Sequence, residues 1–221
     1  MNTRAINMQK RRDRILSEAR RLIVEQGYEA LNTRDLAKAA GVTAPTLYNL
    51  IGNKEQILIE LFIEAVERIE ARLTEFESAP PLDMAEAIVI QSTDLFAIDE
   101  HFYKAAMIAS DHLSVDTANM QAVDLINSRS SEMAAKACRA AQAEGLLRGN
   151  ISAKELGEQM YICYRVPFRD WGLGLIDLEE FSRIALRGFY MCLASDAVDT
   201  FRQELIKKLR LLNKTSLKKA G

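Results

Sequence analysis

Apolar residues recur with a helical period along almost the whole sequence, and this spacing constrains the fold more than any other feature. Between residues 10 and 26, Ile15, Ala19, Leu22 and Ile23 share one helical face, and charged residues occupy the opposite face. Pro occurs only 4 times and Gly only 10 times in 221 residues, which favours long helices over many short turns. No stretch of useful length alternates apolar and polar residues as a half-buried strand would. The sequence therefore predicts an all-α protein.

Start and stop signals divide this pattern into separate helices. Thr33 and Thr43 are placed as caps of two short helices, and Gly41 lies in the turn between them. Asn53, followed three residues later by Gln56, predicts the start of a long helix that ends at a pair of prolines. Further helices are expected at about residues 83–98, 102–113, 117–147, 152–173, 177–195 and 198–212.

The charges are distributed unevenly along the chain. Residues 1–54 hold ten Lys or Arg against five Asp or Glu, a balance of +5, whereas residues 55–221 carry a balance of −7. We therefore expect a small three-helix head at 1–54 and a larger helical body at 55–221, with about nine to ten helices in total. A basic head on an acidic body is typical of a protein whose head alone meets a polyanion.

The composition also limits where the protein works and what it contains. The N-terminus lacks the apolar core of a signal peptide and no apolar run reaches the length of a membrane span, so a cytoplasmic protein that does not enter the membrane is expected. Cys138, Cys163 and Cys192 are widely spaced and form no CxxC pair. They are therefore interpreted as buried thiols in a reducing compartment.

Residue patterns that would support catalysis are missing from the sequence. We find no Gly-rich phosphate loop, no carboxylate cluster at metal-binding spacing and no arrangement of a nucleophile with His. His101 and His112 are eleven residues apart, too far along a helix to hold one metal ion together. The expectation is a protein that is not an enzyme and that needs neither a cofactor nor a metal.

The two short helices joined by "AGVT" at residues 40–43 predict a helix-turn-helix motif. Gly41 permits a tight turn, and Leu36, Val42 and Leu47 are expected to anchor both helices to the first helix. The outer face of the second helix is polar, as a helix that reads base edges in a major groove must be. The predicted DNA-binding residues are Thr33, Arg34, Thr43, Ala44, Pro45, Thr46, Tyr48, Asn49 and Lys54.

These residues divide into two expected roles. Thr46 and Asn49 are expected to contact base edges, so they would set the preferred sequence. Arg34, Tyr48 and Lys54 suit phosphate oxygens, together with backbone N–H groups at helix starts. Contact with DNA would explain why an aromatic ring such as Tyr48 stands on a helix with so little other apolar surface.

The string "GYEALNTRDLAKAAGVTAPTLYNLIGNKEQIL" resembles the DNA-binding head of the TetR/AcrR family of bacterial transcriptional regulators, and the resemblance covers residues 10–60. It implies a dimeric repressor whose recognition helices enter successive major grooves of a palindromic operator, and which a small molecule releases. Leu50 and Ile51 stand where the family commonly has His, or a similar polar residue, and Phe. Leu50 is therefore not carried over as a DNA contact.

The resemblance also implies that the last two major body helices, about 152–174 and 177–195, form a four-helix bundle between two copies. The second of them carries an apolar stripe with small residues that suits a two-fold interface. The predicted interface residues are Phe181, Ile184, Ala185, Gly188, Phe189 and Cys192. The alternative is that the same stripe packs inside one chain.

An effector site in the body is expected around the helix at 152–174, where aromatic residues and two Arg alternate. Arg beside aromatic rings suits an anionic or flat aromatic molecule. The predicted lining is Gln91, Phe102, Ile126, Met133, Tyr161, Arg165, Phe168 and Trp171. The alternative is that these residues form core and salt bridges at the dimer interface.

Two functions fit these observations. One is a ligand-responsive transcriptional repressor, and the other is a ligand-independent architectural or division-control protein with the same DNA-binding head. A cavity in the body that binds a small molecule distinguishes the first from the second.

Overall fold

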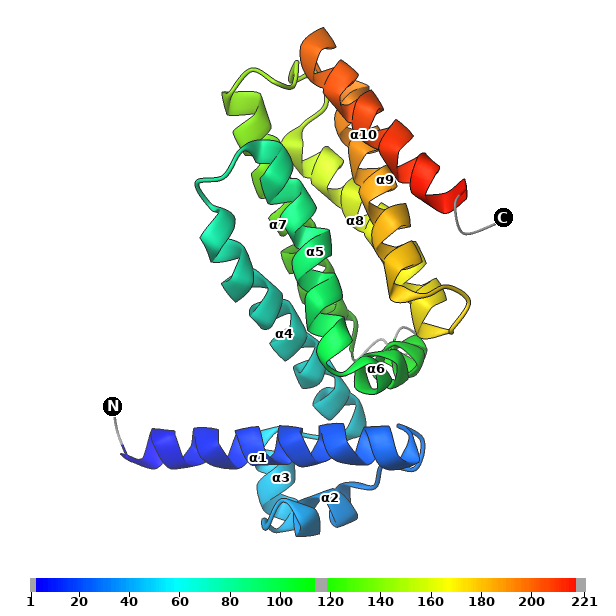
Figure 1. Cartoon of the computed structure of the whole chain (residues 1–221). Helices are drawn as coiled ribbons and strands as arrows, with labels where there is room; N and C mark the ends of the chain where they lie inside the picture. The colour runs from blue at the N-terminus through cyan, green and yellow to red at the C-terminus, as the bar shows by residue number, and fades with distance from the viewer. Residues whose placement is uncertain (1–2, 114–118, 218–221) are drawn as a thin grey trace. The chain divides into compact units, whose positions relative to one another are not determined.

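The computed structural model of the chain, drawn in Figure 1, describes residues 3–113 and 119–217. The side chain of His112 and the predicted helix start at residue 117 lie outside this description. The helices are α1 (Thr3–Gln26), α2 (Thr33–Ala39), α3 (Ala44–Leu50), α4 (Lys54–Leu73), the short 3-10 helix η1 (Thr74–Phe76), α5 (Pro81–Ile98), α6 (Glu100–Leu113), α7 (Met120–Ala143), α8 (Ala153–Gly172), α9 (Leu178–Asp196) and α10 (Asp199–Leu217).

Most predicted helix starts are confirmed by their hydrogen bonds. The Thr43 side chain accepts from the backbone N–H of Thr46 at 3.3 Å. Asn53 and Gln56 form a reciprocal box, in which each backbone N–H donates to the other side chain at 2.9–3.0 Å. These contacts satisfy N–H groups that the first turn of a helix leaves without a partner.

Several boundaries differ from the sequence prediction, three of them at helix starts. Asn32, not Thr33, caps α2: its backbone is extended and its side-chain oxygen accepts from the N–H of Arg34 at 2.8 Å. The first helix begins at Thr3 rather than at residue 10, because its exposed first turns carry no apolar period that a sequence pattern could detect. Pro81 opens α5, in the first helical position where a missing N–H costs nothing.

Packing divides the chain into two compact units. One comprises Met1–Glu67 with Asp99–Ile126, and the other comprises Arg68–Ile98 with Asn127–Gly221. Both α4 and α7 therefore contribute residues to each unit. The boundary predicted after residue 54 separates a DNA-binding head from the body by function, whereas these two units are defined by packing. The predicted boundary therefore stays a prediction.

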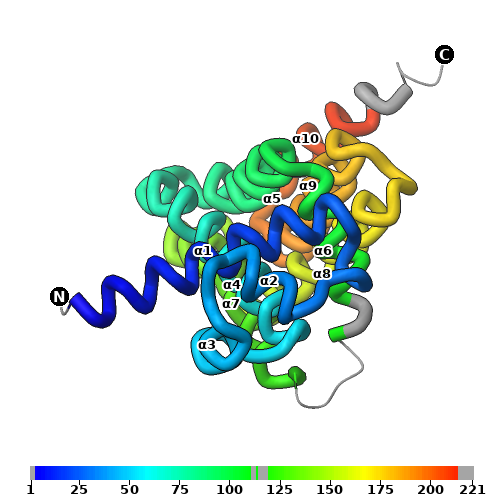
Figure 2. Tube along the Cα trace, turned by 90° about the horizontal axis from the view of Figure 1, so that it is seen from below, coloured from blue at the N-terminus to red at the C-terminus, as the bar shows by residue number. Residues whose placement is uncertain are grey.

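In the first unit, α1 is the helix against which α2, α3 and α6 pack. Figures 1 and 2 show α2 and α3 close beside α1. Ile15, Ala19 and Ile23 form the buried stripe of α1, as the apolar spacing predicts. On α6, the ring of Phe102 lies 4.1 Å beneath the guanidinium carbon of Arg20, a cation–π contact between α1 and α6.

In the second unit, α9 is the central helix and packs against α5, α8 and α10. A cluster of aromatic rings joins three of these helices. The ring of Phe96 on α5 lies 5.1 Å from Phe168 and 5.3 Å from Trp171, both on α8, and Phe181 on α9 lies 6.1 Å from Phe96. Such contacts add to the free energy of burying the rings.

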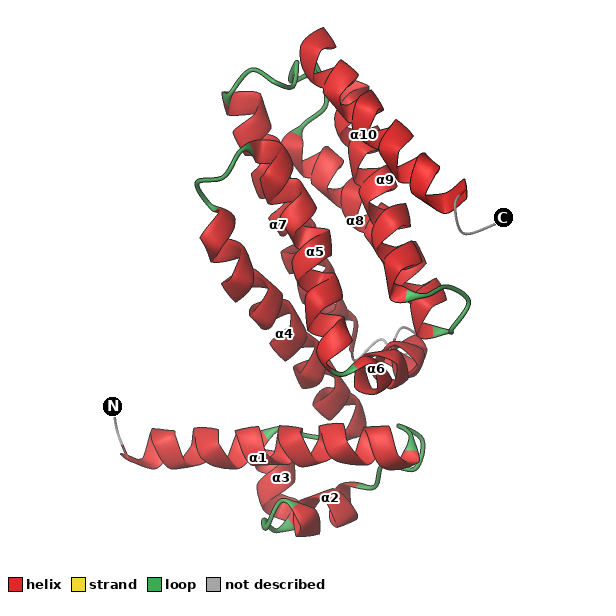
Figure 3. Cartoon of the chain, in the orientation of Figure 1, coloured by secondary structure: helices red, strands yellow, loops and turns green. Residues whose placement is uncertain are grey.

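Figure 3 shows helices and loops only, and no strand occurs in the described ranges. Leu147 and Ala197 form an isolated antiparallel bridge between two loops. The prediction of an all-α fold is confirmed. No helix among the described residues is long and apolar enough to cross a membrane.

Candidate nucleic-acid interface

A tight turn joins α2 to α3. The α2 helix closes with bonds from Gly41 N–H to the carbonyl of Lys38 at 3.1 Å and from Val42 N–H to the carbonyl of Ala37 at 2.9 Å. Gly41 has φ of +65°, a left-handed conformation that residues with a Cβ rarely adopt. The glycine is therefore required for the turn that sets the direction of α3.

Buried side chains hold the motif in place from inside. Leu36, Ala37 and Leu47 are buried, whereas Val42 is half-buried. Arg14 on α1 donates to the carbonyl of Ala40 at 3.5 Å. Because α3 has only seven residues and buries only Leu47, its position depends on these contacts rather than on its own helical stability.

The outward face of α3 carries the side chains predicted to meet DNA. Thr43, Pro45 and Asn49 are exposed, and Tyr48 keeps 53% of its surface accessible. Ala44 and Thr46 are half-buried. The hydroxyl groups of Thr43 and Thr46 lie 2.8 Å apart, so Thr46 already has one hydrogen-bond partner. A hydroxyl can both donate and accept, which leaves Thr46 capacity for a base edge.

The C-terminal end of α3 is held by Arg12, a residue that the sequence analysis did not single out. Its guanidinium donates to the carbonyl of Leu50 at 2.7 Å and forms an ion pair with Glu60 on α4. Arg12 thus satisfies a terminal carbonyl of α3 while fixing it to two longer helices. A local sequence pattern could not predict this contact, because Arg12 and Leu50 are 38 residues apart.

A small hollow of about 280 Å³ lies beside Arg12, between the start of α1 and the end of α3. Asn49 and Leu50 form its α3 side. Leu50 is half-buried at this hollow, which residues from the first turns of α1 also line.

The predicted phosphate contacts differ in their surroundings. Arg34 is exposed at the start of α2, and Thr33 beside it is half-buried. The ammonium of Lys54 donates to the carbonyl of Glu29 at 2.9 Å and lies 4.4 Å from the centre of the Tyr28 ring. Burial is the main cause that raises the pKa of Tyr28, which remains a neutral partner beneath this cation. Lys54 thus has a structural role in addition to any contact with DNA.

The residues predicted to line an effector site are distributed over both units. Phe102 and Ile126 belong to the first unit, whereas the other six belong to the second. Phe168 and Trp171 lie in the aromatic cluster, where they pack against each other at 5.7 Å. The hydroxyl of Tyr161 donates to Asn127 at 3.0 Å, while Arg165 is exposed. Phe168 and Trp171 thus contribute to the aromatic core of the second unit, and the effector site around α8 stays a prediction.

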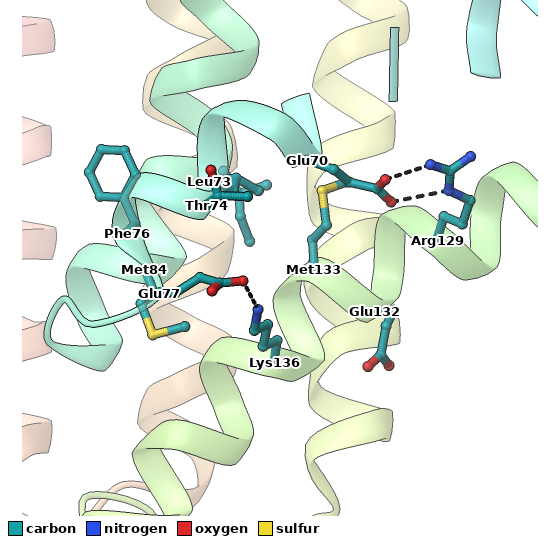
Figure 4. A pocket seen from close by; sticks show the side chains of 11 residues that line it. Glu70, Leu73, Thr74, Phe76, Glu77, Met84, Arg129, Glu132, Met133 and Lys136 are labelled. Carbon is teal, nitrogen blue, oxygen red and sulfur yellow. Dashed lines mark hydrogen bonds and ion pairs between the residues drawn. The ribbon is translucent and has the colours of Figure 1, made fainter. Parts of the chain in front are cut away.

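A cavity of about 330 Å³ lies instead between α4, η1, α5 and α7 within the second unit (Figure 4). Of the predicted lining, it contains Met133 alone. Its other lining residues are Glu70, Leu73, Thr74, Phe76, Glu77, Met84, Ile88, Arg129, Glu132 and Lys136.

Two ion pairs span this cavity. Arg129 on α7 donates to both carboxylate oxygens of Glu70, at 2.5 and 3.1 Å, and Lys136 donates to Glu77 at 2.6 Å. Figure 4 shows Met133 between these pairs, and the remaining walls are mainly apolar. Charged groups beside an apolar wall could bind the polar and apolar parts of one small molecule. The sequence offered no pattern for this cavity, since each pair joins residues 59 positions apart.

The predicted dimer stripe of α9 is largely used within one chain. Phe181, Ala185, Phe189 and Cys192 are buried there, as in the internal alternative, whereas Ile184 and Gly188 are half-buried. The exposed apolar surface of α8 and α9 comes from other residues. Ile162 and Val166 on α8 keep 47% and 57% of their surface accessible, and Met191 on α9 keeps 57%.

Comparison with known proteins agrees with this geometry. The family model of bacterial regulatory proteins, tetR family, matches residues 15–61. The fatty acid metabolism regulator protein of Bacillus subtilis is 33% identical over 98 residues, which cover 44% of this chain and 45% of that protein. The chain thus spans less than half the length of this curated relative.

Solved structures share the fold over a longer stretch. A putative TetR-family regulator from Syntrophomonas wolfei has a TM-score of 0.70 at 18% identity, covering 84% of this chain and 96% of that one. The Thermus thermophilus repressor FadR, solved with lauroyl-CoA, has a TM-score of 0.65 at 19% identity, covering 85% and 95%.

The turn geometry, the buried anchors and the polar outer face of α3 define a helix-turn-helix protein with a helical body. Residues 15–61 thus match the model of the tetR family of bacterial regulatory proteins, and the chain shares the fold of a solved structure named as a putative TetR-family regulator.

Proposed function

We propose that the protein is a transcriptional repressor that binds a palindromic operator as a homodimer and is released by a small-molecule effector. The observation that carries this proposal is the exposed polar face of α3, held by Leu47 from inside and by Arg12 at its end. A short helix presented rigidly with polar side chains outward suits entry into a major groove. Thr46 and Asn49 would contact base edges, and Arg34 and Tyr48 would contact phosphates.

The dimer is proposed to form through the exposed apolar residues of α8 and α9. Ile162 and Val166 are four residues apart, so they lie on the same side of α8, and Met191 adds to the apolar surface from α9. In such a dimer the two α3 helices must enter grooves about 34–36 Å apart, one turn of DNA. Val166→Glu is expected to give monomers in sedimentation. The control, Lys154→Glu at an exposed position of α8, is expected to leave the dimer intact.

The effector is proposed to bind in the cavity that Met133 lines. Its volume of about 330 Å³ is at the small end of ligand sites, and its apolar walls suit the apolar part of a molecule. Lauroyl-CoA is a rational first probe, because the Thermus thermophilus relative was solved with it. Released and bound states would differ in the separation of the two heads, so a ligand that favours one separation shifts DNA binding.

The first experiment measures binding of the purified protein to DNA from upstream of its own gene and to unrelated DNA. Both are measured at low and at near-physiological salt, because non-specific binding weakens steeply as salt rises. Selective, salt-tolerant binding supports the proposal. Equal binding to both DNAs favours an architectural protein or an operator elsewhere, which binding to genome-wide fragments would separate.

The second experiment tests the cavity. A ligand that binds only the folded protein increases the free energy of unfolding, by about 2.7 kcal/mol when its concentration is 100 times the Kd. The unfolding temperature therefore rises, and this rise is the quantity measured. Met133→Trp fills the cavity and is expected to abolish this effect. Met120→Trp is the matched control, because Met120 is on the same helix but 54% exposed. An effector that stabilises both variants equally would place its site elsewhere.

A further inference from the structure

Two of the three cysteines meet between α8 and α9. The sulfur of Cys163 lies 3.9 Å from that of Cys192, and the side-chain amide of Gln159 donates to Cys163 at 3.8 Å. Cys138 differs from both, since it is fully buried beside the sulfur of Met160 at 3.6 Å. The structure therefore separates a contacting thiol pair from a core thiol.

The pair exists because the two helices approach closely at Gly188. A Cβ at this position would lie 2.5 Å from the Cβ of Cys163 and 3.0 Å from its sulfur. Any larger residue would push α8 and α9 apart. Gly188 lies one helical turn before Cys192 on α9, so the close approach brings the second thiol to Cys163.

The two thiols also differ in acidity and access. The hydrogen bond from Cys192, followed by that from Gln159, lowers the pKa of Cys163 to about 6. The same shared bond raises the pKa of Cys192. Cys163 is half-buried, whereas Cys192 is nearly closed to solvent. An accessible thiolate beside a protonated thiol is the arrangement of an attacking cysteine and a resolving one.

We propose that Cys163 and Cys192 are a peroxide oxidation site that forms a reversible disulfide between α8 and α9. The Cys163 thiolate attacks one oxygen of hydrogen peroxide, the O–O bond breaks, and a sulfenic acid forms at Cys163 with release of water after protonation. Cys192 then attacks the sulfenic sulfur, loses its proton and expels a second water. Two thiols are oxidised by two electrons and one peroxide is reduced to two waters.

The disulfide requires the two sulfur atoms to move closer together. Its S–S bond is about 2.05 Å long, so the two sulfurs must approach by about 2 Å from their present contact. Rotation of the two side chains towards each other is the smallest change that achieves this. The cross-link would hold α8 against α9, beside the apolar surface of Ile162 and Val166 proposed for the dimer. The site itself does not depend on the proposed DNA-binding function.

The experiment treats the full-length protein with hydrogen peroxide, blocks the remaining thiols and maps tryptic peptides without reduction. The expected product joins peptide 155–165, which contains Cys163, to peptide 188–202, which contains Cys192. Dithiothreitol should restore two free peptides. Cys138→Ser is the matched control and should cross-link like the parent, whereas Cys163→Ser should yield no cross-link.

Cys192→Ser separates the two steps. It removes the resolving thiol, so Cys163 should accumulate as a sulfenic acid that dimedone labels. Far-ultraviolet circular dichroism of each variant checks that the helices are retained. The proposal is overturned if both thiols stay reduced in the folded protein while the unfolded chain oxidises. It is equally overturned if Cys163 oxidises to sulfinic acid, or bonds to a second chain, without joining Cys192.

Discussion

The helices α3 and α9 both carry residues that the sequence analysis assigned to contacts with another molecule, yet they use them differently. The seven-residue α3 buries Leu47 and leaves Tyr48 and Asn49 on the surface. The nineteen-residue α9 buries Phe181 and Phe189 in the core of its own unit. An apolar stripe on a long helix is first of all the surface on which the chain folds. Surface that is free for a partner is what the fold leaves uncovered.

The largest expected effect tests whether the α9 stripe is internal. Phe189→Ala removes a ring that is 1% exposed, which should lower the free energy of unfolding by about 3–5 kcal/mol. Urea denaturation followed by circular dichroism measures this change. The matched control is Ser195→Ala at an exposed position of α9, with a change within about 1 kcal/mol expected. Equal losses in the two variants would contradict the internal assignment.

A second prediction concerns how α3 is held. Arg12→Met removes the hydrogen bond to the Leu50 carbonyl and the ion pair with Glu60, and should cost about 1.5–3 kcal/mol of stability. Because α3 would be less well positioned, affinity for an operator should fall as well. Arg11→Met, at the exposed neighbouring position, is the control. If Arg11→Met lowers stability as much, Arg12 does not hold the end of α3.

A third prediction separates base readers from phosphate contacts. Asn49→Ala should change which operator is preferred, by about 1–3 kcal/mol for the base pair it contacts. Competition between the parent operator and single-base variants measures this preference. Unchanged preferences across the whole set of base variants would remove Asn49 from the base-reading residues.

The smallest expected effect on folding is at Tyr48. Its side chain is 53% exposed, so Tyr48→Ala should alter the free energy of unfolding by no more than about 0.5 kcal/mol. Binding to all DNA sequences should nevertheless weaken by a similar factor, because a phosphate contact carries no base information. The measurements are thermal unfolding and binding at two salt concentrations. A marked loss of stability would make Tyr48 a structural residue.

The prediction from sequence succeeded where the deciding contacts are local. The cap at Thr43, the Asn53–Gln56 box and the turn at Gly41 depend on residues within one helical turn, so their pattern is visible in the chain. Even here one cap was assigned one residue too late, because Asn32 caps α2 and Thr33 was predicted to do so. Both side chains can cap, and only the backbone conformation distinguishes them.

Prediction from the sequence was least complete where contacts between residues distant in the chain determine the structure. The aromatic side chains of α8 suggested a ligand site, and only the structure shows that one of them, Phe168, contacts Phe96 on α5 and Phe181 on α9. The cavity beside Met133 is bounded by ion pairs between α7 and residues near the end of α4 and η1. The apolar periodicity of a helix indicates which of its faces is apolar, but it does not indicate which other helix packs against that face.

By itself the sequence determined the all-α class, most helix starts and the helix-turn-helix motif, because hydrogen bonds and backbone sterics act over a few residues. Only the tertiary structure decided which apolar faces are buried, where a cavity remains and which thiols touch. Those outcomes depend on close packing between segments distant in the chain, where a single residue such as Gly188 sets how near two helices lie.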